Sequence, residues 1–262
     1  MNAGVREYWI IDTKRQKIIC YWFEGKVLGG NMYKKTYLLF KNFMTACMEE
    51  DGVHGREHIY RVLYNGLEIA KTEENVDYNV LIAACLLHDI GRKEEKENLG
   101  LPHALVGGDK AYDFLVKHGF AKDYAERVKH CIQNHSKKRE NMELSLEAKI
   151  LFDADKIDLT GAIGLARTLM YQGSFSEPIY IRCPDGRISD GEKDTEPSFF
   201  QEYKCRLEKI PSWLYTRKAR EIAAKRQEIA AEFYKSLYQE VSEACIMGEK
   251  DVVQMLLSEK VL

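Results

Sequence analysis

The 262-residue chain lacks long apolar runs: no window of 18 consecutive apolar residues occurs, and its first residues carry charge throughout. We therefore expect neither a membrane span nor a signal peptide. An excess of one charge is missing as well, because the formal net charge is only −2. That balance gives no general electrostatic footprint for nucleic acid.

Paired cysteines are also missing: the seven cysteines are dispersed, and none forms a Cys-x-x-Cys spacing. An odd and scattered set is typical of reduced thiols, not of a disulfide framework or a zinc knuckle. We therefore expect a cytoplasmic protein. A hydrophobic content of 45% and a charged content of 31% fit a soluble globular protein, and the length fits one large domain or one domain plus a small appendage.

Two kinds of periodicity divide the chain. Strand-like runs at Tyr8–Ile11 and Lys17–Phe23 flank the polar stretch "DTKRQ", which predicts a hairpin. From about Tyr33 onward, apolar residues recur at helical spacing. The predicted class is all-α with a small N-terminal β-hairpin. The expected parts are the hairpin at 1–32, a helical domain at 33–245 and a short C-terminal helical tail at 246–262.

The hairpin segment, "VREYWIIDTKRQKIICYW", resembles the C-terminal hairpin of a PD-(D/E)XK-type nuclease family. Such a nuclease needs upstream carboxylates, for which the sequence has no room, so we expect no nuclease activity. An isolated two-stranded hairpin is only marginally stable in water. We expect it to pack on the main body or on another chain, which leaves a homo-oligomer open.

Histidine and aspartate interrupt the apolar helical segments at several points. The stretches are "HGREHIYRV", "LLHDIG", "LPHALVGG", "IQNHSKK" and "LFDADKID". A buried carboxylate is costly unless something neutralises it, and a divalent cation neutralises carboxylates while it binds neutral imidazole. Mixed nitrogen and oxygen ligands suit Mn, Fe, Co, Ni or Zn better than Ca. The pattern therefore favours a divalent transition metal.

The ordered set of His58, the adjacent pair His88 and Asp89, and then Asp155 resembles the HD-domain superfamily of metal-dependent phosphohydrolases. The motifs "HIYRV", "LLHDIG" and "DADKIDLTGAIGLART" carry the resemblance, which spans roughly residues 35–240. It implies that these four residues are the metal ligands. Asp153 and Asp158 flank the last ligand, and we expect them to orient it or its lysine neighbour.

The resemblance gives two answers for the number of ions. His103 in "HALVGG" and His135 in "IQNHS" lie where binuclear members of the superfamily place two further histidines. The segments "DADKIDLTGAIGLARTLMYQG" and "SFFQEYKCRLEKI" instead resemble a bacterial subgroup that includes nucleoside triphosphate pyrophosphohydrolases, where one metal is usual. We favour one tightly held ion and leave a second open, with His130 as the substitute if helix phase excludes His135.

The implied reaction is hydrolysis of a phosphate ester or anhydride of a nucleotide or other small phosphorylated metabolite by metal-activated water. Asp89, Arg92 and Lys156 are the candidate catalytic residues. Positive charge must also meet the phosphate oxygens, and the candidates for this contact are Arg61, Lys137, Arg167 and Lys204. The irregular loop at 174–198 is long enough to act as a lid.

Two other functions remain compatible with the sequence. One is a non-catalytic ligand-binding or interaction module that uses the aromatic hairpin as its contact surface. The other is a mixed-valence di-iron oxygenase, since some HD proteins have that activity and the histidine count permits it.

Overall fold

The structure is a computed structural model that describes residues 5–12, 17–24, 30–49, 52–98, 100–137 and 143–258. The chain separates into two compact units, Met1–Phe43 and Met44–Leu262. In the first unit, β1 (Val5–Asp12) and β2 (Lys17–Glu24) form an antiparallel hairpin in which Val5 lies opposite Glu24. The helix α1 (Gly30–Cys47) follows the hairpin. How the hairpin packs stays a prediction.

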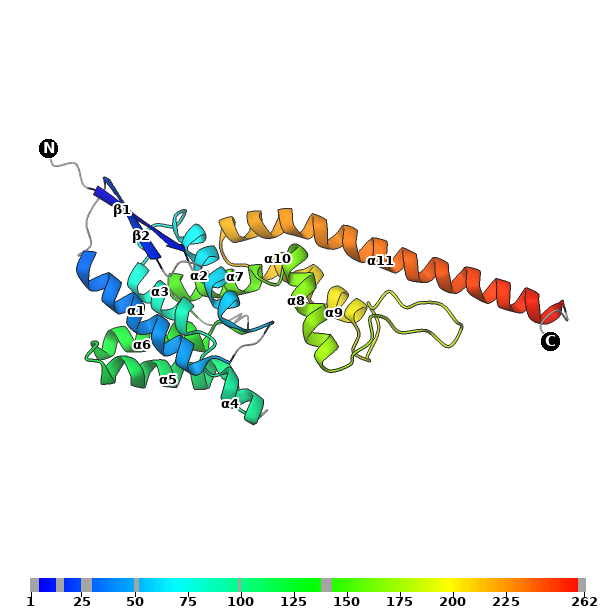
Figure 1. The fold of residues 1–262 in the computed structure, drawn as a ribbon, viewed down its shortest axis with the longest axis horizontal. Coiled ribbons are helices and arrows are strands. Elements are labelled where there is room, and N and C mark those ends of the chain that lie inside the picture. Colours follow the sequence, from blue (N-terminus) through cyan, green and yellow to red (C-terminus); the bar gives the residue numbers. More distant parts are fainter. Residues whose placement is uncertain are drawn as a thin grey trace. The chain divides into compact units, whose positions relative to one another are not determined.

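The second unit is helical, as the sequence predicts (Figure 1). Its elements are α2 (Arg56–Ala70), α3 (Tyr78–Leu87), α4 (Arg92–Glu97), α5 (His103–Lys117), α6 (Lys122–Gln133), α7 (Leu146–Ile157), α8 (Gly161–Ser174), α9 (Phe199–Cys205), the 3₁₀ turn η1 (Leu207–Lys209), α10 (Ile210–Trp213) and α11 (Arg217–Leu257). None of the helices in the described part of the chain combines the length and the hydropathy of a membrane span.

The helix α3 is the centre of the core. Every residue from Val80 to Leu87 except Ile82 is buried. Asp77 caps its first turn by accepting hydrogen bonds from the backbone N–H groups of Asn79 and Val80. The helix packs against α2, α6 and α7, which explains why its sequence is apolar nearly all round. It ends at Leu87, so His88 and Asp89 lie in the turn that follows.

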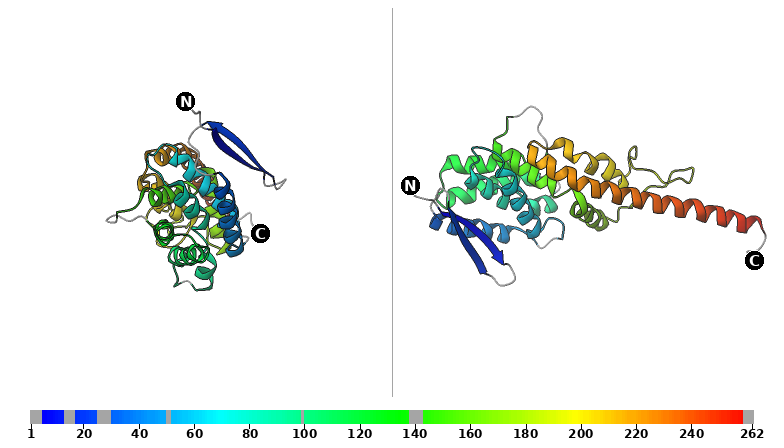
Figure 2. Two further views of the ribbon diagram at one scale, coloured as in Figure 1. Left: turned by 90° about the vertical axis from the view of Figure 1, so that its left-hand side faces the viewer. Right: turned by 90° about the horizontal axis from the view of Figure 1, so that it is seen from above.

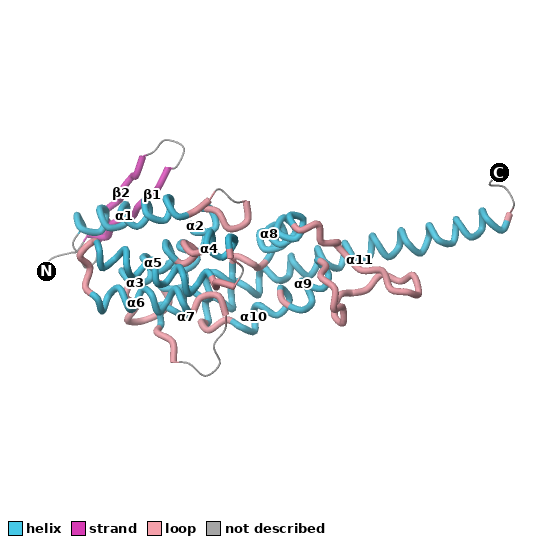
Figure 3. The backbone as a smooth tube through the Cα atoms, turned by 90° about the horizontal axis from the view of Figure 1, so that it is seen from below, coloured by secondary structure: helices cyan, strands magenta, loops and turns pink. Residues whose placement is uncertain are grey.

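The loop at 175–198 is bound to α11, beside which it runs in Figure 3. The Tyr234 hydroxyl donates to the Asp190 carbonyl at 2.6 Å, and Arg182 forms an ion pair with Glu249. Phe200, in α9 just after the loop, is fully buried, and its ring contacts Tyr234 with centroids 5.2 Å apart. The lid function stays a prediction, and these contacts hold the loop against α11.

The helix α11 continues to Leu257 without a break. The sequence predicts a separate terminal helix from 246 onward, but no proline interrupts the segment, so the two predicted helices form one. Large apolar side chains of its last turns are exposed, including Met247 at 66% and Leu257 at 80%. In Figures 1 and 2 this end of α11 extends beyond the other helices of its unit.

Candidate metal centre

Four histidines meet in the core of the second unit, and each is anchored through its Nδ1 atom. His88 Nδ1 donates to the Cys85 carbonyl at 2.8 Å, and His135 Nδ1 donates to the Ile132 carbonyl at 2.6 Å. Because a carbonyl oxygen only accepts, the proton of each ring sits on Nδ1 and the lone pair on Nε2.

The other two histidines are held by carboxylates in the same way. His58 Nδ1 lies 2.8 Å from Asp158 Oδ2, and His103 Nδ1 lies 2.8 Å from Glu95 Oε1. A carboxylate on Nδ1 fixes the tautomer of a metal-binding histidine and makes its Nε2 more basic. All four Nε2 atoms are therefore prepared as ligands.

The first group of ligand atoms is made by His58, His88, Asp89 and Asp155. His58 Nε2 lies 3.4 Å from His88 Nε2 and 3.3 Å from Asp155 Oδ1. Asp89 Oδ2 lies 3.7 Å from both imidazole nitrogens. These are the four residues that the HD resemblance implies.

The second group uses the other oxygen of the same aspartate. His103 Nε2 and His135 Nε2 lie 3.3 Å apart, and each is 3.5 Å from Asp89 Oδ1. Asp89 thus stands between two sets of histidines. The structure therefore places His103 and His135, the two histidines of the predicted second metal site, next to the first group of ligands. His130 contacts Asn134 and is not needed as a substitute for His135.

The spacing and burial of these atoms fit a metal. Two atoms that both lie 2.0–2.1 Å from one ion are roughly 3.0–3.4 Å apart, close to the separations in each group. Asp89 is completely buried, and neither of its oxygens has a hydrogen-bond partner in the described residues. A buried carboxylate with no hydrogen bond is costly. Its ion pair with Arg92, whose Nε lies 3.1 Å from Oδ1, offsets part of that cost, and a bound metal ion would offset more of it.

The electrostatics of the site keep most of the ligands in their metal-binding protonation state. Burial lowers the pKa of His88 to about 3, so this imidazole is neutral. Burial alone would raise the pKa of Asp89, but Arg92 and the surrounding histidines outweigh it and hold the pKa well below its usual range. Lys156 and His58 do the same for Asp155. His58 differs: burial acts to lower its pKa, but Asp155 and Asp158 raise it overall, so a metal competes there with a proton.

Asp158 organises one side of the centre. Besides His58, it binds Arg61 Nε at 2.7 Å and Arg167 Nη1 at 2.7 Å. Arg167 Nε also donates to the Val53 carbonyl at 2.9 Å. The two arginines were predicted to bind phosphate. Their guanidinium groups are engaged by Asp158 in this structure, and contact with phosphate stays a prediction.

Lys156 and Arg92, two of the candidate catalytic residues, both bind metal-ligand carboxylates. Lys156 Nζ lies 2.7 Å from Asp155 Oδ2, whereas Oδ1 is the oxygen that pairs with His58. Arg92 Nε lies 3.1 Å from Asp89 Oδ1, and Arg92 Nη1 donates to Glu95 Oε2 at 2.9 Å. Arg92 is the more accessible of the two, with 27% of its side chain exposed.

The remaining predicted residues lie elsewhere. Lys204 pairs with Glu208 at 3.1 Å and stands over the Tyr234 ring, so its contacts are with η1 and α11. Lys137 is exposed two residues after His135. Asp153 was expected to orient Asp155 or Lys156, but its carboxylate accepts from the backbone N–H groups of Tyr215 and Thr216. Two residues along a helix point about 200° apart, which explains the difference.

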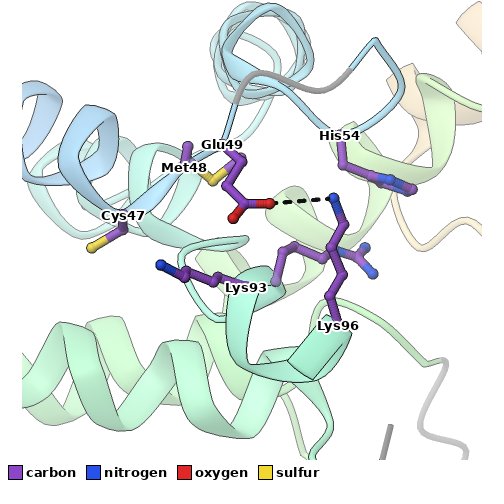
Figure 4. A pocket seen from close by; sticks show the side chains of 7 residues that line it. Cys47, Met48, Glu49, His54, Lys93 and Lys96 are labelled. Atoms are coloured by element: carbon purple, nitrogen blue, oxygen red, sulfur yellow. Dashed lines mark ion pairs between the residues drawn. The ribbon is translucent and has the colours of Figure 1, made fainter. Parts of the chain in front are cut away.

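Sequence reasoning missed two features of the site. Glu95 is not among the site residues predicted above, and in the structure it holds His103. No local spacing marks that role, because the two residues lie on separate helices. A small pocket beside the centre was also missed. It is lined by Cys47, Met48, Glu49, His54, Arg92, Lys93 and Lys96 (Figure 4).

The fold and the site together define an all-helical domain with a histidine–aspartate centre, and residues 55–160 match the family model of the HD domain. YpgQ of Bacillus subtilis is 27% identical over 198 residues, which cover 74% of this chain and 87% of YpgQ. The crystal structure of YpgQ in complex with ADP gives a TM-score of 0.60 at 25% identity, covering 78% of this chain and 97% of that one.

A predicted HD superfamily hydrolase from an uncultured Thermotogales bacterium is also similar, with a TM-score of 0.52 and 27% identity over 77% of this chain and 90% of that one. The HD match and these neighbours support the HD superfamily for this chain, and a metal-dependent hydrolase in general. The likeness of the hairpin to a PD-(D/E)XK-type nuclease stays a prediction.

Proposed function

We propose that this protein is a metal-dependent phosphohydrolase that hydrolyses a phosphate ester or anhydride of a nucleotide or other small phosphorylated metabolite. The observation that carries the proposal is the pair of histidine groups on the two oxygens of Asp89. His58, His88, Asp89 and Asp155 would hold one ion, and Asp89, His103 and His135 a second. The ADP complex of YpgQ supports a nucleotide as the substrate.

The balance of fixed charge around the centre supports an anionic substrate. Four carboxylates are matched by four cationic side chains, which are Arg61, Arg92, Lys156 and Arg167 against Asp89, Glu95, Asp155 and Asp158. Because these charges cancel, a divalent cation bound among the imidazoles would leave the centre positive. Phosphate oxygens that gain negative charge during hydrolysis would be stabilised there.

Hydrolysis forms a bond between a water oxygen and phosphorus and breaks the bond from phosphorus to the leaving oxygen, which takes up a proton. A bound divalent ion lowers the pKa of such a water and polarises a phosphoryl oxygen. The protein's own groups have other tasks. Arg92 is the partly exposed cation beside Asp89, where it would meet the phosphate. Lys156 and Asp158 would keep Asp155 and His58 in place.

The test combines metal content with activity. Purified protein should contain transition metal by elemental analysis and release phosphate or pyrophosphate from members of a nucleotide panel. His88→Ala should lose both. His103→Ala should lower the ratio of metal to protein from about two to about one, because His103 faces only the second group.

His118→Ala is the matched control, since His118 is exposed and bound to the Phe114 carbonyl at the end of α5. It should keep metal and activity. Oxygen consumption by an iron-loaded protein without phosphate release would favour the di-iron oxygenase instead. Ligand binding with no turnover on any substrate would favour the non-catalytic module.

A further inference from the structure

The pocket next to the metal centre shares residues and contacts with it. Arg92 lines the pocket and at the same time lies 3.1 Å from Asp89 Oδ1, the oxygen that faces His103 and His135. His54 lines the other side, and its ring centroid is 6.3 Å from that of His58. A group bound in the pocket would therefore be a direct neighbour of a group bound at the centre.

Most of the charged side chains that line the pocket are cationic. Arg92, Lys93 and Lys96 come from α4, and Glu49 is the one carboxylate among the described residues that line the pocket. Arg92 is already paired with Asp89 and Glu95. Among the described lining residues, Lys93 and Lys96 against Glu49 still leave one positive charge in excess, which favours an anion. Two phosphate groups joined by a bridging oxygen are such neighbours, so a substrate with a phosphoanhydride could place one phosphate at the centre and the next one here.

Glu49 already pairs with one of these cations, Lys96. Its carboxylate lies 3.8 Å from Lys96 Nζ, and in Figure 4 the two side chains reach toward each other across the pocket. Both are about half exposed, at 53% for Glu49 and 51% for Lys96. A long and solvated ion pair is weak, so a phosphate can replace the carboxylate at small cost.

We propose that the pocket of His54, Arg92, Lys93 and Lys96 is a subsite for the phosphate that neighbours the one under attack, and that Glu49 is an internal competitor for it. Glu49 would then lower the affinity for substrates with two or more linked phosphates and leave monophosphates unaffected. The proposal rests on the proposed function, because it takes the attacked phosphate to lie at the metal centre.

Isothermal titration calorimetry on the Mn²⁺-loaded protein tests it, with α,β-methylene-ADP and AMP as probes. Glu49→Gln should bind the ADP analogue roughly two- to fivefold more tightly, since a competing half-exposed charge is removed. Lys96→Gln should bind it roughly three- to tenfold more weakly. Neither change should alter AMP binding.

The double variant provides the sharper measurement. If Glu49 acts through Lys96, the gain from Glu49→Gln should largely vanish in the Lys96→Gln background. Glu68→Gln is the matched control, because this exposed glutamate pairs with Lys71 outside the pocket at 2.8 Å. It removes the same charge and should change neither affinity.

If Glu49→Gln changes the affinity for AMP and for the ADP analogue equally, or leaves the affinity for the analogue unchanged, Glu49 is not a competitor of the phosphate. Equal effects of Lys96→Gln on AMP and the analogue would overturn the subsite. Calorimetry separates this proposal from the proposed function, because binding is measured without turnover. If the protein hydrolyses no substrate but its affinity for the ADP analogue changes selectively, the subsite is supported and the proposed function is wrong. If it is a hydrolase and these affinities do not change, the proposed function is supported and the subsite is wrong.

Discussion

At the scale of single residues, Asp89 explains why two polar side chains follow a buried helix in "LLHDIG". Its oxygens face different histidines, Oδ2 toward His58 and His88, and Oδ1 toward His103 and His135. On a regular helix adjacent side chains point about 100° apart. Because α3 ends at Leu87, the following turn lets both His88 and Asp89 reach the same centre.

Asp158 offers a test of how the ligands are oriented. Asp158→Asn leaves the buried Arg167 without its carboxylate and weakens the anchor of His58. The free energy of unfolding should fall by about 3–5 kcal/mol, as it does when one partner of a buried ion pair is removed. Metal affinity should fall roughly 10–100-fold.

Urea denaturation and metal titration measure the two effects of Asp158→Asn. The matched control is Asp185→Asn, whose partner Arg187 is 80% exposed, and it should change neither quantity. If Asp158→Asn is as stable as the native protein and binds metal with the same affinity, Asp158 does not orient the ligands.

A second residue-scale prediction concerns thiol reactivity. Burial raises the pKa of Cys131 to about 12, so at pH 8 only roughly one thiol in ten thousand is ionised. Iodoacetamide reacts with the thiolate, and native protein should therefore remain unlabelled at Cys131. The partly exposed Cys183 should be labelled. Peptide mass spectrometry before and after unfolding in guanidinium checks this, and native labelling at Cys131 equal to that at Cys183 would contradict it.

At the scale of elements, the centre is built from helix ends. His103 is the first residue of α5, His58 lies in the first turn of α2, and Asp155 lies in the last turn of α7. Side chains at helix ends can leave the packed helix surface without disrupting it. The start of α4 lies close to the start of α5, and this close approach depends on Gly91, which immediately precedes α4.

Gly91→Ala tests that approach. An added Cβ would lie 2.3 Å from the His103 carbonyl oxygen and 2.7 Å from the Gly107 nitrogen, and both are backbone atoms that cannot move aside cheaply. We expect a loss of about 1–3 kcal/mol in the free energy of unfolding, together with weaker binding of the ion that uses His103. Gly173→Ala in α8 is the control, since no atom lies within 4 Å of its added Cβ. Equal stability of the two variants would show that the contact is not tight.

At the scale of the whole molecule, the centre forms only when distant segments pack. His58 and Asp158 are 100 positions apart, and His103 and His135 come from α5 and from the turn after α6. A ligand that binds only this folded arrangement stabilises the entire second unit, because the unfolded chain cannot offer the same set of atoms.

Metal removal is therefore a test at this scale. Returning Mn²⁺ to chelator-treated protein, at 100 times its dissociation constant, should raise the free energy of unfolding by about 2.7 kcal/mol. For a chain of this size the melting temperature should rise by roughly 5–10 °C. Calorimetric melting curves measure the shift, and His88→Ala should show almost none. An equal shift in that variant would place the stabilising ion at another site.

Much of this protein could be predicted from local pattern. The helical class of the second unit is confirmed because apolar periodicity is a property of neighbouring residues. The predicted HD superfamily is supported by the match of residues 55–160 to the HD domain. It could be predicted because the ligands of that superfamily fall in short motifs. The role of Asp153 was predicted differently, because its partner Thr216 is distant in the sequence and meets it only through packing. The predicted terminal helix is part of α11, which continues to Leu257.

The amino-acid sequence by itself determined which chemical groups are available: four imidazoles and several carboxylates set in apolar helices, in the order typical of HD proteins. Only the tertiary structure decided that Asp89 stands between two histidine pairs, that Glu95 holds His103, and that Arg61 and Arg167 bind Asp158. The physical reason is that a helical period fixes where side chains point along one helix, whereas the meeting of ligand atoms depends on how separate helix ends pack in three dimensions.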